Sequence, residues 1–114
     1  MFAFEETERC IYVLKLEDDY FYVGQTETER LEKRVRMHGT KKGAAWTLIH
    51  RPVALHEVLS VGNTTEKQAR LEENKVTLQY MESQGWRKVR GGIASHLRSH
   101  AIRRVGEAVR VRIT

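Results

Sequence analysis

The chain contains little cysteine and proline and has no long apolar run, and the lack of cysteine pairs and of apolar runs each excludes a class of protein. Its 114 residues include one cysteine, Cys10, and one proline, Pro52. A single cysteine cannot form an internal disulfide, which excludes a disulfide-stapled secreted scaffold and fits a reducing compartment. No apolar run approaches the roughly 18 residues that span a bilayer, so we expect no membrane partner.

Acidic residues are scarce toward the C-terminus. Residues 1–85 hold 12 Lys/Arg and 14 Asp/Glu, a net charge of −2, whereas residues 86–114 hold eight Lys/Arg and only Glu107, a net charge of +7. A nearly neutral body with a basic end predicts a polyanionic partner that is attracted through its phosphates. A basic face that serves only solubility is the alternative.

The beginning of the chain and its length limit localisation and domain number. Residues 1–6 are acidic, whereas a secretory signal would begin with basic residues, so we expect a cytoplasmic protein. A length of 114 residues suits a single hydrophobic core. We expect a domain over residues 1–92 and a basic extension over residues 93–114 that packs on the same domain or continues it.

Two stretches rich in β-branched and aromatic residues, 10–16 and 20–26, predict an antiparallel hairpin. A three-residue loop at 17–19 would place Tyr12 opposite Gly24, and would bring Tyr12 and Tyr22 together on one face of the sheet. A two-residue loop would shift the register by one and place the two tyrosines on opposite faces.

The rest of the chain predicts two helices and a third strand. Thr26 or Thr28 could cap a helix over residues 28–38, and Pro52 precedes a strand over residues 53–61. A second helix should run from about residue 66 to 84, where Gly85 would end it. We therefore predict an α/β fold, with a small central sheet of about three strands flanked by helices.

These segments carry residues whose order and spacing resemble the GIY-YIG nuclease superfamily across residues 10–92. The matching positions are Tyr12, Tyr22-Val23-Gly24-Gln25-Thr26, Leu31-Glu32-Lys33-Arg34, His38, Trp46-Thr47, Pro52, Ala69, Glu73 and Val89-Arg90-Gly91-Gly92. The chain departs from the superfamily at Cys10, which stands where the Gly-Ile-Tyr motif that gives the superfamily its name has glycine. Because this position is a strand residue and not a catalytic one, the departure does not argue against nuclease activity.

The resemblance implies a DNA endonuclease that hydrolyses phosphodiester bonds with a bound Mg²⁺ or Mn²⁺. It implies a tyrosine general base, Arg34 as the phosphate clamp and Glu73 as the single metal ligand. We favour Tyr12 as the base and Tyr22 as its partner, with the reverse assignment left open. The residue chemistry agrees with these roles. Arg34 has a permanently charged guanidinium that can bind phosphate through two hydrogen bonds, Glu73 has hard oxygen ligands for a cation, and His38 can relay a proton.

Basic residues outside this set are candidates for binding nucleic acid: Lys41, Lys42, Arg87, Lys88, Arg90, Arg98, Arg103 and Arg104. Trp86 beside them could stack on a base, or could close the core behind the long helix. His96 and His100 have a spacing that could bind zinc on a helix, but no cysteine pair or nearby acid completes such a site.

Two other functions compete with the endonuclease. A non-catalytic nucleic-acid-binding module could use the same scaffold, and an assembly factor could dock an acidic protein through the basic end. No sequence-reading module is recognisable, so we expect DNA to be recognised by its form, whether single-stranded, double-stranded or branched. Otherwise a homodimer or a protein partner would supply specificity.

Overall fold

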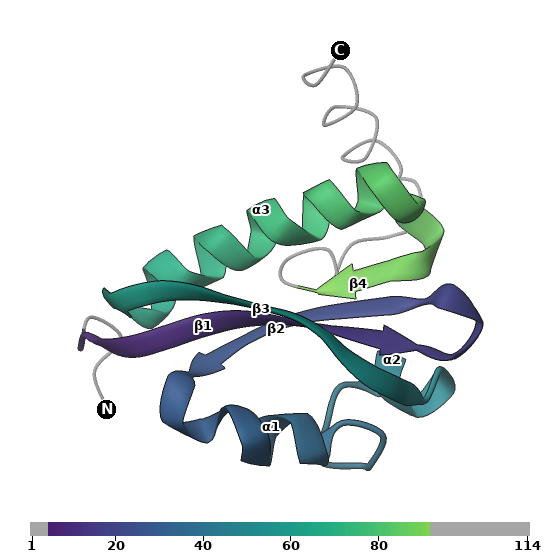
Figure 1. Cartoon of the computed structure of the whole chain (residues 1–114), viewed down its shortest axis with the longest axis horizontal. Coiled ribbons are helices and arrows are strands. Elements are labelled where there is room, and N and C mark those ends of the chain that lie inside the picture. The colour runs from purple at the N-terminus through teal and green to yellow at the C-terminus, as the bar shows by residue number, and fades with distance from the viewer. Residues whose placement is uncertain (1–4, 92–114) are drawn as a thin grey trace.

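The computed structural model describes residues 5–91 as a four-stranded sheet with helices on both faces (Figure 1). The strand order is β3-β1-β2-β4. In chain order the elements are β1 (Thr7–Leu16), β2 (Phe21–Glu27), α1 (Leu31–Met37), α2 (Ala45–Ile49), β3 (Pro52–Thr64), α3 (Glu66–Gln84) and β4 (Val89–Gly91). The predicted α/β class is confirmed. The expected extension over 93–114, with Arg98, Arg103, Arg104, His96 and His100, lies outside the described residues.

The hairpin has the register that the site requires. Residues 17–19 form a three-residue turn, and the Leu16 amide donates to the carbonyl of Tyr20 at 2.7 Å. Asp18 and Asp19 close this turn with φ angles of 60° and 62°, a conformation that aspartate tolerates better than most residues. Tyr12 therefore pairs with Gly24, as the three-residue loop predicts.

Alternation along β1 gives the sheet two apolar faces. Ile11 and Val13 pack beneath α3 in a cluster that includes Met81. Tyr12, Leu14 and Leu16 point to the opposite face, where α1 and α2 lie. Figure 1 shows α3 above the sheet and α1 below it, so catalytic candidates on α1 and α3 approach from different sides.

The sheet has one strand more than the three expected, because Val89–Gly91 forms β4. This strand is only three residues long and pairs in parallel with Phe21–Val23 of β2. So short a segment has no periodicity for sequence reasoning to detect. Among the described residues, β4 pairs with β2 as far as Val23, and no other strand pairs with residues 24–27 of β2 on that side.

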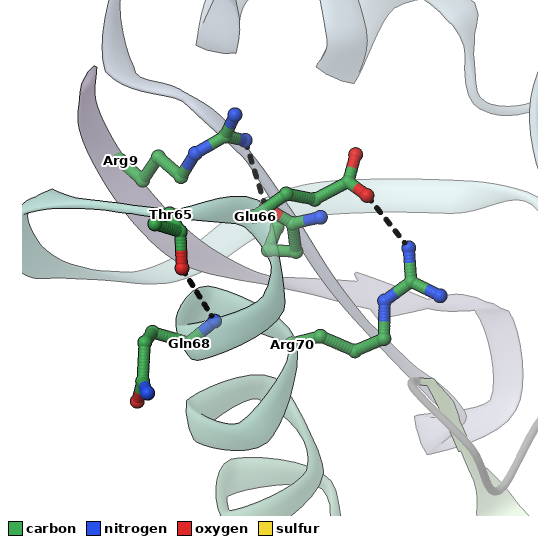
Figure 2. Close-up of polar contacts among 6 residues, drawn as sticks. Arg9, Thr65, Glu66, Gln68 and Arg70 are labelled. Carbon is green, nitrogen blue, oxygen red and sulfur yellow. Dashed lines mark hydrogen bonds and ion pairs between the residues drawn. The ribbon is translucent and has the colours of Figure 1, made fainter. Parts of the chain in front are cut away.

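The helices confirm one predicted cap and correct another. Thr65 accepts a hydrogen bond from the Gln68 amide at 3.1 Å to begin α3 (Figure 2). As predicted, Gly85 ends that helix, with a φ of 99°. The proposed cap by Thr26 or Thr28 is wrong. The segment starts instead with a 3-10 turn over Thr28–Arg30, and no side chain caps α1.

None of the helices in residues 5–91 is both long enough and apolar enough to span a membrane.

Candidate active site

Two phenols on the α1 face form the centre of the candidate site. The ring centroids of Tyr12 and Tyr22 are 6.4 Å apart, as diagonal neighbours on adjacent strands should be. Tyr12 is fully buried, with 0% of its surface exposed, whereas Tyr22 is half-buried. Only Tyr22 of this pair therefore presents part of its surface to solvent.

Gly24 makes room for the phenol of Tyr12. A Cβ atom at Gly24 would lie less than 3.0 Å from three atoms of Tyr12: Cζ, Oη and Cε2. Any larger residue would push the tyrosine away from its position. The glycine is thus required by the close approach of a side chain rather than by its own backbone angles.

His38 fixes the hydroxyl end of Tyr12. The Tyr12 Oη lies 2.7 Å from Nε2 of His38, and the Ala44 amide donates to Nδ1 at 3.3 Å. Because Nδ1 accepts a hydrogen bond, Nε2 carries the ring proton and donates it to the phenol oxygen. Burial, and secondarily the charge of Arg34, lower the pKa of His38 to about 4. The ring is therefore neutral at pH 7.

Thr47 holds the loop around His38. Its Oγ1 accepts from the Gly39 amide at 3.1 Å and donates to the Ala44 carbonyl at 2.7 Å, while lying 3.4 Å from Nδ1 of His38. Gly43 packs against the histidine, since a Cβ there would lie 2.7 Å from the His38 Cα. This cage fixes the imidazole without using charge.

Arg34 contributes the positive charge of the site. It is exposed on α1, where a guanidinium can reach a substrate phosphate. Through a side-chain hydrogen bond and its charge it lowers the pKa of Tyr12, and through its charge alone it lowers that of Tyr22. Arg34 is thus the group that favours a phenolate at either position.

Glu73 brings a negative charge from α3. It is 7% exposed, between Ala69 and Val76, while the neighbouring Glu72 pairs with Lys75 in solvent. Its carboxylate is close enough to both phenols to raise their pKa values. Within residues 5–91 no group of three or more His, Cys, Asp or Glu residues is arranged to hold a metal ion.

Both phenols resist ionisation in this state. Desolvation is the largest cause, and Glu73 adds to it. Together they raise the pKa of Tyr22 to about 12, despite the opposing effect of Arg34. Burial, and then Tyr22, raise the pKa of Tyr12 above its ordinary value as well. A cation beside Glu73 would remove one of these causes, which makes the carboxylate a suitable place for Mg²⁺.

The remaining basic candidates have different surroundings. Lys41 and Lys42 are exposed in the turn after α1, and Arg87 and Lys88 are exposed after α3. Arg90 is engaged within the protein: its guanidinium lies 4.5 Å from the Trp46 ring centroid and donates to two backbone carbonyls. Burial lowers the pKa of Arg90.

Trp86 packs against the apolar cluster beneath α3, and Arg87 lies over its ring at 4.9 Å. These contacts give Trp86 the core position that was one of its two predicted roles.

Comparison with known proteins identifies relatives for half of the chain. No protein-family model and no solved structure matches it. It is 39% identical over 54 residues to a UPF0213 protein of Bacillus cereus, a match covering 47% of this chain and 54% of the relative. It is 41% identical over 51 residues to UPF0213 protein YazA of Bacillus subtilis, covering 45% and 50%. The chain thus spans about half the length of the curated relatives it matches.

Proposed function

We propose that the protein is a metal-dependent DNA endonuclease of the GIY-YIG type. The observation that supports this proposal is the convergence of five side chains: Tyr12 of β1, Tyr22 of β2, Arg34 of α1, His38 directly after α1, and Glu73 of α3. Their mutual electrostatic effects and the hydrogen bond from His38 to Tyr12 link all five. A base, a phosphate clamp and a metal ligand are the groups that phosphodiester hydrolysis needs.

In the proposed reaction a phenolate takes one proton from a water molecule. The resulting hydroxide attacks phosphorus, the bond to the leaving oxygen breaks, and that oxygen takes a proton from solvent. Arg34 holds the phosphate and balances the charge that develops on its oxygens. A Mg²⁺ or Mn²⁺ held by Glu73 would supply Lewis-acid stabilisation of that charge. The neutral His38 holds the base in place through its Nε2 proton.

Two observations favour different tyrosines as the base. Tyr12 receives hydrogen bonds from His38 and Arg34, and such donors stabilise a phenolate. Tyr22 is the one with exposed surface, which a base needs to meet water. We retain Tyr12 as the proposed base and Tyr22 as its partner, and the pH dependence of the variants distinguishes them.

The first test is incubation of the protein with supercoiled, linear, branched and single-stranded DNA. We expect nicking in the presence of Mg²⁺ or Mn²⁺, and none with a chelator, because the carboxylate site needs a cation to neutralise charge. Comparison of the four DNA forms identifies the preferred shape. RNA of matched sequence is the control for the choice of nucleic acid.

Two results, from this assay and from binding measurements made beside it, would contradict the endonuclease proposal. Salt-sensitive binding without metal-dependent nicking would indicate the non-catalytic nucleic-acid-binding module. Indifference to nucleic acid, with binding to an acidic protein that survives high salt, would indicate the assembly factor. Light scattering at the assay concentration tests whether a homodimer is the active form.

The pH dependence of cleavage identifies the base. Because the phenol pKa values are raised, the ionised fraction at neutral pH is small and increases about tenfold for each pH unit. The wild-type rate should therefore rise with pH from 7 toward 9. If Tyr12 is the base, Tyr12→Phe should lose roughly 10²–10⁴-fold in rate and lose this rise.

Tyr22→Phe serves as the matched control, since it removes the same hydroxyl from the neighbouring phenol. It should keep the rise with pH. The opposite pattern would assign the base to Tyr22, and an unchanged profile in both variants would exclude a tyrosine base altogether.

A further inference from the structure

A cavity of about 220 Å³ lies beside Arg34, at the end of β2 that follows its paired residues Phe21–Val23. Residues lining it include Arg9 of β1, Gln25 of β2, Lys33 and Arg34 of α1, and Glu66 at the start of α3. The cavity therefore reaches from α1, on one face of the sheet, to the start of α3 on the other face. The volume suits one small group better than a drug-sized molecule.

The acidic side chains of this cavity already have cationic partners. Glu27 lies 3.7 Å from Arg30, which also lines the cavity. Glu66 pairs with Arg70 at 3.2 Å, and Figure 2 shows its carboxylate joined to Arg70 while Arg9 lies on the other side. Neither carboxylate is therefore left to neutralise Arg9 or Lys33.

Arg9 has an unused hydrogen-bond donor. Its Nη1 donates to Oε1 of Gln25 across 3.4 Å, a long bond, while its buried Nε has no hydrogen-bond partner among the residues described. A buried donor without an acceptor is unfavourable, so a ligand that draws the Arg9 guanidinium into the cavity would relieve this cost. Lys33 immediately precedes Arg34 and is exposed on the same helix. No ion pair within residues 5–91 engages Arg9 or Lys33.

We propose that Arg9 and Lys33 bind a backbone phosphate of the nucleic acid next to the one held by Arg34. This inference rests on the proposed function, because it places the strand across the same site. The phosphodiester backbone would then pass the end of β2, beside Gln25 and Glu27, from α1 toward the start of α3. Arg9 and Lys33 would position the strand without touching the reacting atoms.

The test measures binding and cleavage separately. Fluorescence anisotropy with a labelled single-stranded oligonucleotide, in chelator, gives the affinity at several salt concentrations. We expect Arg9→Gln and Lys33→Gln each to weaken binding by about 3–10-fold and to reduce the salt slope by roughly 0.7. At saturating DNA with Mg²⁺, kcat should stay within about twofold of wild type, because neither side chain acts on the transition state.

Arg36→Gln is the matched control for Lys33, since Arg36 lies on the same helix, is exposed and pairs with Glu32 at 2.8 Å outside the cavity. Lys15→Gln at the other end of β1 is the control for Arg9. If the cavity variants changed the salt slope no more than these controls, the inference would be overturned. Thermal denaturation of all four variants shows whether a change in binding reflects a loss of folded protein.

Two further outcomes separate this inference from the proposed function. If Arg9→Gln and Lys33→Gln reduce the salt slope as expected but the wild type does not cut DNA, the phosphate site stands and the endonuclease proposal fails. Stabilisation by inorganic phosphate, with unchanged DNA slopes in the variants, would assign the cavity to a free phosphate ligand and overturn the strand path.

Discussion

Glu73→Gln is expected to reduce Mg²⁺-dependent cleavage by roughly 10³-fold or more while leaving the protein folded. The amide has nearly the shape of the carboxylate, so the packing of α3 on the sheet should survive. What is lost is the negative charge that would hold the cation. The same change should lower the pKa values of Tyr12 and Tyr22, because Glu73 is one of the causes that raise them.

Three measurements check this prediction. Cleavage assays give the rate, Mn²⁺ binding by electron paramagnetic resonance gives the metal affinity, and ultraviolet titration of the tyrosinate band gives the phenol pKa values. Glu72→Gln is the matched control, since Glu72 is adjacent, pairs with Lys75 at 3.2 Å and has 45% of its side chain exposed. Wild-type cleavage and Mn²⁺ affinity in Glu73→Gln would show that the metal site lies elsewhere.

Local patterns in the sequence were sufficient to predict the hairpin and the two ends of α3. Whether Tyr12 and Tyr22 lie on the same face of the sheet depends on one turn. Glu17-Asp18-Asp19 forms that turn because aspartate tolerates a positive φ. Thr65 and Gly85 likewise bound α3 by capping chemistry that short peptides already obey. Glu73 lies on the buried side of this helix, where its neighbours at helical spacing, Ala69 and Val76, are apolar.

Side-chain contacts made across loops and between elements were beyond such reasoning. The cage around His38 depends on the Ala44 amide and on Thr47, and nothing in the local sequence shows which ring nitrogen would accept a hydrogen bond. Trp46-Thr47 was among the matching motif positions, but that match did not show what the Thr47 side chain contacts. Arg9 and Lys33 were missed because charges next to a strand end and on an exposed helix usually face solvent. Their meeting depends on how α1 crosses the end of β2.

Gly24→Ala should disrupt both stability and the site, although it adds a single methyl group. The new Cβ would lie less than 3.0 Å from three atoms of the Tyr12 side chain, which is fully buried and cannot yield toward solvent. We expect a loss of about 2–3 kcal/mol in the free energy of unfolding, or a drop in Tm of roughly 10 °C. Movement of Tyr12 would also break its hydrogen bond to His38, so cleavage should fall with stability.

Two further variants isolate this clash from a general cost of replacing glycine. Gly62→Ala places a Cβ where no atom lies within 4 Å, so it should lose only the roughly 1 kcal/mol of a residue forced to a φ of 74°. In a double-mutant cycle, Tyr12→Leu should relieve most of the destabilisation caused by Gly24→Ala, because the ring atoms that the methyl meets are gone. Additive losses in that cycle would mean that the tyrosine does not occupy the space above Gly24. The pairing of the phenol with His38, and with it the proposed base, would then require a different geometry.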